Sequence, residues 1–151
     1  MTSIAQGVDL LPHRPPMRLV EEIADLVPGQ SARGLRVAHP DDWYFQGHFP
    51  GDPVVPAIVL VELLAQTGGL AAASHDRVSA GGRLLRVAAL GSFKFPRGAR
   101  PNQVLEARAQ VAGRIGGMIK IEGEVLADGI RVAIGSVTLA EVGARPQGKR
   151  S

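Results

Sequence analysis

Two ionisable side chains, His48 and Glu62, stand out by their surroundings. His48 lies in residues 39–56, a segment rich in glycine, proline and aromatic residues that contains the only Trp and the only Tyr of the chain. The ordinary pKa of imidazole lies near neutrality, so a histidine held in such a loop can act as a general base. A lone loop histidine is more often a surface or packing residue, and a base also needs an acid beside it.

Glu62 is the only charged residue between Pro53 and Ser74, the most apolar stretch of the chain. Burying a carboxylate is unfavourable unless it is paired or protonated, and burial raises its pKa. A carboxyl group that keeps its proton near neutral pH can donate it as a general acid. Gln66 follows at i+4, on the same helix face, where it could orient Glu62 or a water molecule. The alternative is that Glu62 faces a wet interface or satisfies a buried polar group.

The prolines and the hydrophobic periodicity predict the elements that position these side chains. Four prolines exclude a long helix from residues 39–56. The last of them, Pro56, suits the first turn of a buried helix that runs to about Ala73. Alternating apolar residues on both sides of this region indicate strands, with hairpin turns at residues 116–117 and 128–129. The predicted strands cover residues 18–27, 31–38, 84–95, 104–111, 118–126 and 130–139.

The element order of two strands, a loop, one buried helix and about four strands predicts an α+β fold, in which an antiparallel sheet covers one long helix. The chain has 151 residues, of which 45% are apolar, and this fits one domain. We assign that domain to residues 1–141 and expect a loose basic tail over residues 142–151.

Composition excludes several classes of protein. Cysteine is absent, so there is no disulfide framework, Cys-ligated zinc, iron–sulfur cluster or cysteine nucleophile. The start of the chain lacks the features of a secretory signal, so we expect a cytoplasmic protein. Glu62 lies within the apolar stretch and argues against a membrane span. The His and Asp residues of segment 39–52 match no metal-ligand spacing, and no Walker loop or dinucleotide fingerprint is present.

The net charge of +3 does not indicate a nucleic-acid surface. Three basic residues of the tail account for it, because residues 1–141 contain 14 basic and 14 acidic residues. Within this neutral body, residues 77–114 hold eight basic residues and one acidic residue. This basic segment is either a set of solvated strand edges and loops or a docking patch for an acidic protein.

Residues 46–66 read QGHFPGDPVVPAIVLVELLAQ. This segment closely resembles the beta-hydroxyacyl-acyl-carrier-protein dehydratases of bacterial type II fatty-acid synthesis, whose signature is G-H-F-P-x-x-P followed by a helix with E-x-x-A-Q. Two more blocks resemble the family in the same order, LPHRPPMRLVEE at residues 11–22 and FKFPRGARPNQVLE at residues 93–106. The resemblance covers about residues 10–140.

This resemblance implies the hot-dog fold, an antiparallel sheet wrapped around one long central helix. It implies homodimers with shared active sites, His from one subunit and Glu from its partner, often assembled further into hexamers. The implied reaction removes water from a 3-hydroxyacyl thioester on the phosphopantetheine arm of acyl carrier protein and yields a trans-2-enoyl thioester. It requires no metal or redox cofactor.

The same resemblance implies the roles of individual residues. His48 would remove a proton from C2 of the substrate, and Glu62 would donate a proton to the departing 3-hydroxyl group. The backbone N–H groups of Ala57 and Ile58, at the helix start, would polarise the thioester carbonyl. Gln66 would hold Glu62 or the water.

One departure from the family pattern keeps alternatives open. Ala57 stands where the family has glycine, so a Cβ lies where the backbone would approach the substrate. The alternatives are a hot-dog thioesterase and a non-catalytic subunit that binds acylated carrier protein. The resemblance also implies an apolar tunnel that takes the acyl chain. Within the basic segment, we expect Lys94, Arg97 and Arg100 to lie nearest the mouth of this tunnel and to dock the carrier protein.

Overall fold

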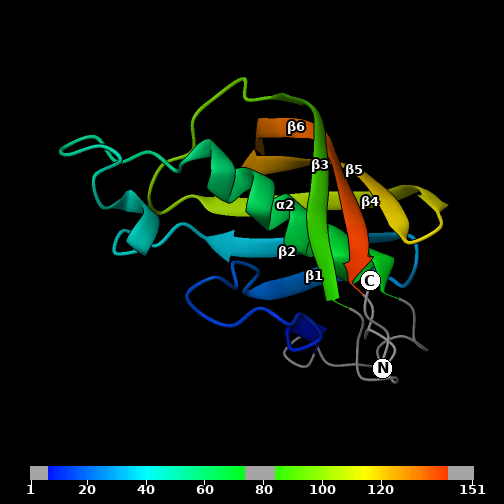
Figure 1. The fold of residues 1–151 in the computed structure, drawn as a ribbon. Coiled ribbons are helices and arrows are strands. Elements are labelled where there is room, and N and C mark those ends of the chain that lie inside the picture. The colour runs from blue at the N-terminus through cyan, green and yellow to red at the C-terminus, as the bar shows by residue number, and fades with distance from the viewer. Residues whose placement is uncertain (1–6, 74–83, 143–151) are drawn as a thin grey trace, which may run out of the picture.

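The structure is a computed structural model that describes residues 7–73 and 84–142. A six-stranded antiparallel sheet curves around one long helix, α2 (Ala57–Ala72), as Figure 1 shows. The strands are β1 (Glu22–Val27), β2 (Ser31–Val37), β3 (Leu84–Lys94), β4 (Val104–Ile115), β5 (Met118–Ala127) and β6 (Ile130–Val142). They lie in the order β1-β2-β4-β5-β6-β3. The predicted α+β architecture is confirmed.

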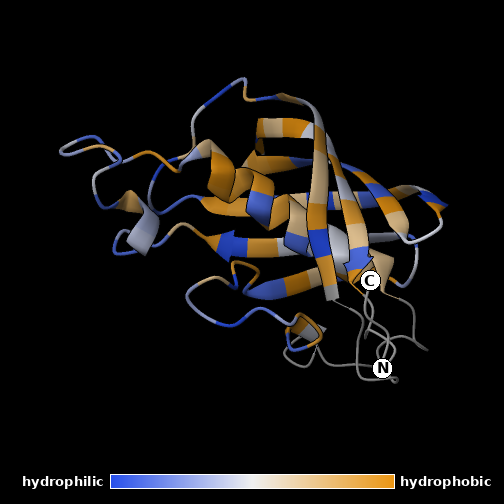
Figure 2. Cartoon of the chain, viewed as in Figure 1, coloured by the Kyte–Doolittle hydropathy of each residue, from blue (hydrophilic) through white to orange (hydrophobic). Residues whose placement is uncertain are grey.

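Close packing fixes α2 against the sheet. Leu64 is fully buried, and Figure 2 shows hydrophobic residues along much of the helix. Two strand glycines lie under the helix, where a side chain would collide. A Cβ on Gly34 would lie 2.6 Å from Oγ1 of Thr67, and a Cβ on Gly123 would lie 2.7 Å from Cδ1 of Leu64. The middle of α2, which carries Glu62, is therefore held close to β2 and β5. Among the described helices, none is long and apolar enough to cross a lipid bilayer.

The first strand begins at Glu22, later than the predicted residue 18. The reason is a side chain that takes the place of a strand partner. The backbone N–H of Leu19 donates to Oε1 of Gln66 on α2, at 2.8 Å. Leu19 and Val20 are buried at this junction.

The strands after the helix extend further than predicted. β4 continues to Ile115 because it pairs with β5 up to the Ile115–Met118 pair. β6 continues to Val142, which pairs with the first residue of β3. Of the predicted tail, residues 142–151, only Val142 lies within the described residues, and it belongs to β6.

β3 forms one edge of the sheet and is hydrogen-bonded only to β6 within the described part of the chain. Two of its apolar side chains are exposed, Val87 at 41% and Leu90 at 56%. A long apolar edge strand offers unpaired backbone groups to another strand. This edge is therefore the part of the fold best suited to sheet extension.

Candidate active site

The imidazole of His48 is held in a defined orientation. A short 3-10 turn, η1 (Trp43–Phe45), is followed by Gly47, whose φ of 78° turns the chain into His48. Nδ1 of His48 lies 3.0 Å from the carbonyl oxygen of Val54. Because a carbonyl oxygen only accepts, this bond places the hydrogen of the neutral ring on Nδ1 and leaves the Nε2 lone pair free. The ring of Phe49 stacks on the imidazole with 4.2 Å between centroids.

The acceptor of this bond is fixed by a closed backbone loop. The N–H of Val54 donates to the carbonyl of His48 at 3.0 Å, and Phe49 and Asp52 exchange two backbone hydrogen bonds, at 2.9 and 3.2 Å. The next residue, Val55, donates its N–H to the carbonyl of Ala99 at 2.8 Å. The His48 loop is thus attached to the segment between β3 and β4.

Glu62 lies near the middle of α2 and is partly buried. Burial raises the pKa of its carboxyl group, and a hydrogen bond with Gln66 partly opposes this rise. A carboxyl group in this setting retains its proton to higher pH than an exposed one, as a general acid must.

Gln66 has a second task that its sequence position did not predict. Its side chain is almost fully buried, and its amide bonds the backbone of the segment before β1. Oε1 accepts the N–H of Leu19, and Nε2 donates to the carbonyl of Met17, both at 2.8 Å. The residue next to Glu62 on the helix face therefore also anchors the N-terminal segment.

The start of α2 leaves backbone donors available. The helix follows Pro56, and no side chain of the described residues caps its N-terminus. The first N–H groups of a helix have no partner within the helix. Ala57 and Ile58 occupy these positions, both exposed, with Ile58 at 74%. Their N–H groups can therefore donate hydrogen bonds to an oxygen atom from outside the chain.

The single chain does not join the two candidate catalytic groups. Among the described residues, no hydrogen bond or ion pair connects His48 to Glu62. In Figure 1 the loop between η1 and α2 projects beyond the N-terminal end of the helix, whereas Glu62 lies on the second turn. Within the described residues, the two candidate groups therefore have no direct contact.

The three basic residues predicted for docking differ in their surroundings. Lys94 and Arg97 are exposed and form no ion pair within the described residues. Nη1 of Arg100 instead lies 2.6 Å from Oδ1 of Asp52, in the His48 loop. Arg100 is therefore tied to that loop, while Lys94 and Arg97 are available to a partner.

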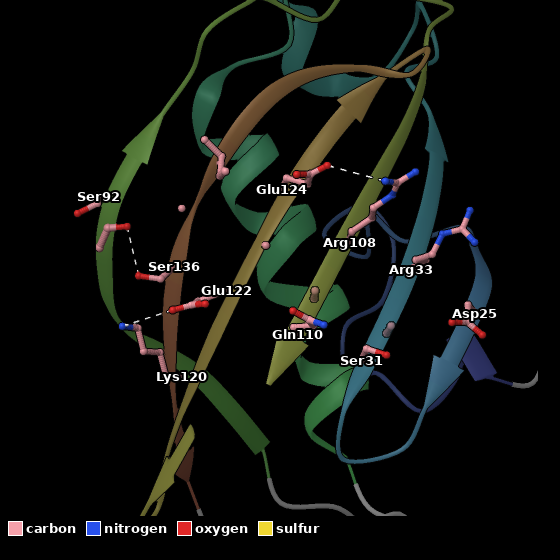
Figure 3. A pocket seen from close by; sticks show the side chains of 16 residues that line it. Asp25, Ser31, Arg33, Ser92, Arg108, Gln110, Lys120, Glu122, Glu124 and Ser136 are labelled. Atoms are coloured by element: carbon pink, nitrogen blue, oxygen red, sulfur yellow. Dashed lines mark hydrogen bonds and ion pairs between the residues drawn. The ribbon is translucent and has the colours of Figure 1, made fainter. Parts of the chain in front are cut away.

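A separate hollow of about 730 Å³ lies on the sheet face away from α2 (Figure 3). Its lining includes Arg33, Arg108 and Glu124 but neither His48 nor Glu62. Its charged side chains mostly neutralise one another, as in the ion pair of Arg108 with Glu124 at 3.9 Å. The described residues contain no group of three or more His, Asp or Glu side chains arranged to hold a metal ion.

Sequence reasoning missed one buried polar cluster, formed by Arg36, Asp42 and Tyr44. The only sequence signal was an acidic residue two positions before a tyrosine in the His48 loop. The approach of Arg36 from β2 depends on the fold and has no local signal.

Comparisons with known proteins define the class. Residues 11–136 match the family described as FabA-like domain. The chain is 40% identical over 111 residues to the 3-hydroxyacyl-[acyl-carrier-protein] dehydratase FabZ of Chloroflexus aggregans, covering 74% of this chain and 76% of that protein. It is 36% identical over 109 residues to the FabZ of Clostridium acetobutylicum, covering 72% and 76%. The chain therefore belongs to the FabA-like family and, within it, to the FabZ dehydratases.

Solved structures confirm the hot-dog fold. The dehydratase heterocomplex ApeI:P from Xenorhabdus doucetiae matches with a TM-score of 0.75 at 18% identity, over 89% of this chain and 90% of that chain. The E. coli PaaI protein matches with a TM-score of 0.59 at 17% identity, over 78% and 80%. At these identities the likeness concerns the fold.

Proposed function

We propose that this protein removes water from 3-hydroxyacyl thioesters carried on acyl carrier protein and releases trans-2-enoyl thioesters, in fatty-acid or related lipid synthesis. The observation that carries this proposal is the hydrogen bond between Nδ1 of His48 and the carbonyl of Val54. It leaves Nε2 as a basic nitrogen, as proton removal from C2 requires.

The proposed reaction uses two proton transfers. Nε2 of His48 takes a proton from C2, and the electron pair forms the C2–C3 double bond while the C3–O bond breaks. Glu62, whose pKa is raised by burial, gives its proton to the departing oxygen, which leaves as water. The imidazolium and the carboxylate then return to their starting states by proton transfer through water. The proposed reaction uses no metal ion or redox cofactor.

The negative charge that develops on the thioester oxygen needs donors. The free N–H groups of Ala57 and Ile58 lie at the positive end of the α2 dipole. We assign the oxyanion site to these two groups. Ala57 presents a methyl group beside this site where the family pattern has glycine, so the site is narrower on that side.

We infer a homodimer in which His48 of one protomer faces Glu62 of the partner subunit. Two observations support this arrangement. The two groups are not in contact within one chain, and the exposed apolar edge of β3 can extend the sheet into a second copy. Assembly of three such dimers into a hexamer is part of the same proposal.

The substrate carrier is proposed to be acidic acyl carrier protein. Lys94 and Arg97 are exposed cations beside the segment that binds the His48 loop. Arg100, which the sequence also predicts to dock the carrier, is paired with Asp52 and supports the His48 loop beside this surface. We propose a cytoplasmic location, which a chain without cysteine fits.

Product analysis of the purified full chain with 3-hydroxyacyl-carrier protein separates the candidate functions. The proposed function predicts an enoyl thioester with the acyl chain still attached to the carrier, at unchanged rate after treatment with a chelator. Release of free carrier thiol would instead identify a thioesterase. Binding of acyl-carrier protein without any turnover would identify a non-catalytic subunit.

A further inference from the structure

A buried ionic cluster lies directly before the His48 loop. Nη2 of Arg36 donates to Oδ1 of Asp42 at 2.7 Å, and the hydroxyl of Tyr44 donates to Oδ2 of Asp42 at 2.6 Å. The side chains of Arg36 and Asp42 are 10% and 11% exposed. Burial and the bond to Asp42 raise the pKa of Tyr44 to about 12, so the phenol keeps its proton and remains a donor.

The Asp42 carboxylate controls the turn that leads to His48. Besides Arg36 and Tyr44, it accepts the backbone N–H of His39 at 3.0 Å. It therefore holds the chain on both sides of its own position. The turn that follows ends at Phe45, whose carbonyl accepts the N–H of His48 at 3.1 Å.

The other end of the cluster reaches the helix that carries the acid. Nη1 of Arg36 donates to the carbonyl of Leu19 at 3.1 Å. The N–H of Leu19 donates to Oε1 of Gln66 at 2.8 Å, and Gln66 lies one turn after Glu62 on α2. A continuous path of hydrogen bonds and short backbone segments thus connects the helix of Glu62 to the loop of His48.

Such a cluster is unfavourable unless every member is satisfied. Taking an ion pair out of water is unfavourable, and good geometry with added hydrogen bonds must offset this cost. Asp42 meets this condition with three donors, and Arg36 with three acceptors, the third being the Tyr44 hydroxyl oxygen 3.5 Å from Nε. A loop that needed only stability could be packed with apolar side chains, whereas directional bonds restrict it to one conformation.

We propose that Arg36, Asp42 and Tyr44 are positioning residues for the loop that carries the general base. The proposal rests on the function proposed above. In a two-fold dimer, each site combines the base of one chain with the acid of the other. The position of the His48 loop relative to α2 within each chain therefore helps to set the distance between base and acid in both sites. A displaced loop would disturb both sites.

Activity and NMR measurements on Tyr44→Phe and Asp42→Asn test this proposal. Tyr44→Phe removes one hydroxyl and keeps the ring, so we expect kcat to fall on the order of tenfold with KM nearly unchanged. Asp42→Asn removes the charge that Arg36 and Tyr44 share, so kcat should fall by roughly 10²-fold. In both variants, the ¹⁵N signals of the His48 ring should show that the hydrogen bond from Nδ1 to the carbonyl of Val54 is weaker.

Thr67→Val is the matched control. It removes another buried hydrogen bond, from Oγ1 of Thr67 to the carbonyl of Leu63 at 2.8 Å, outside the path to His48. It should lower stability while leaving kcat and the His48 ring signals unchanged. If Tyr44→Phe keeps wild-type kcat and ring signals, or if kcat falls equally in the control, the positioning role is wrong.

The two proposals fail in different ways. A wild-type protein without dehydratase activity would contradict the proposed function, while the His48 ring signals would still test the positioning of the loop. If Asp42→Asn does not fold, the kcat and the His48 ring signals of Tyr44→Phe decide whether the cluster positions the loop.

Discussion

Gln66 of α2 binds Leu19 as a neighbouring strand would. Its Oε1 accepts the Leu19 N–H at 2.8 Å, and its Nε2 donates to the carbonyl of Met17 at the same distance. One buried amide thus provides both an acceptor and a donor to the segment before β1. This side chain adds a directional link between the helix that carries Glu62 and the segment before β1.

Gln66→Leu should therefore destabilise the protein strongly. The substitution keeps the size of the side chain but leaves the Leu19 N–H and the Met17 carbonyl without their partner. An unsatisfied buried polar group costs about 1–3 kcal/mol, so we expect a loss of roughly 2–4 kcal/mol in the free energy of unfolding, measured by chemical denaturation. A variant as stable as the wild type would show that these bonds contribute nothing net.

Glu62→Gln should raise stability at the pH where the enzyme works. The folded-state pKa of Glu62 is raised by burial. Below the unfolded-state pKa the carboxyl is protonated in both states, and as pH rises through the folded-state pKa the wild type loses stability. The neutral amide avoids this loss. The melting temperature of the variant should exceed that of the wild type at pH 8, and by a smaller margin at pH 4. A margin that does not change with pH would contradict the burial of the charge.

The order of the elements and the two candidate catalytic residues could be predicted from sequence, because these signals are local. Prolines and alternation predict strands and helix, and a lone Glu62 in an apolar helix is visible without a structure. The contact of Gln66 with Leu19 joins residues 47 positions apart. Such contacts depend on how the segments pack, so the late start of β1 and the role of Arg36 could not be predicted.

The ends of β4 and β6 were underestimated for a related reason. Ile115 is 84% exposed and sits at the tip of a hairpin, where periodicity carries little information. Pairing with the neighbouring strand, not burial, keeps these residues in the sheet. The alternation of apolar and polar residues reflects burial of one strand face. It therefore stops before the hydrogen-bonded end of the strand.

Charge reversal of Lys94 and Arg97 together should affect only carrier-bound substrate. Replacing both with Glu removes two exposed cations and repels an acidic partner, so KM for the carrier-bound thioester should rise on the order of tenfold. A small thioester mimic should be turned over as by the wild type. Lys120→Glu, an exposed cation of β5 that lines the separate hollow, is the matched control. Equal effects on both substrates would exclude a docking role.

Arg100→Glu should behave differently from those two. Its ion pair with Asp52 ties the segment before β4 to the His48 loop. Its loss should therefore lower kcat for both the carrier-bound substrate and the small mimic, by a few-fold because the pair is exposed. A change confined to the KM for carrier-bound substrate would place Arg100 in the docking surface instead.

Leu90→Asp should weaken the homodimer. The side chain is 56% exposed on β3, whose outer edge has no strand partner within the described residues, and a charge there opposes sheet extension. Sedimentation should show a shift to monomer at micromolar concentration, with activity lost in parallel because each site needs two chains. Ile115→Asp, exposed on the hairpin tip, should leave the assembly unchanged. An undiminished dimer in Leu90→Asp would place the interface elsewhere.

The most direct test of the central claim is the rate of enoyl-thioester formation by His48→Ala and by Glu62→Gln. Removal of a general base or acid lowers kcat by about 10²–10⁴-fold, and we expect that loss in each variant with unchanged circular dichroism and assembly. Co-refolding the two inactive variants should restore part of the activity, because a mixed dimer contains one site with both groups intact. Wild-type turnover by either variant alone would contradict the assignment of the base to His48 and the acid to Glu62.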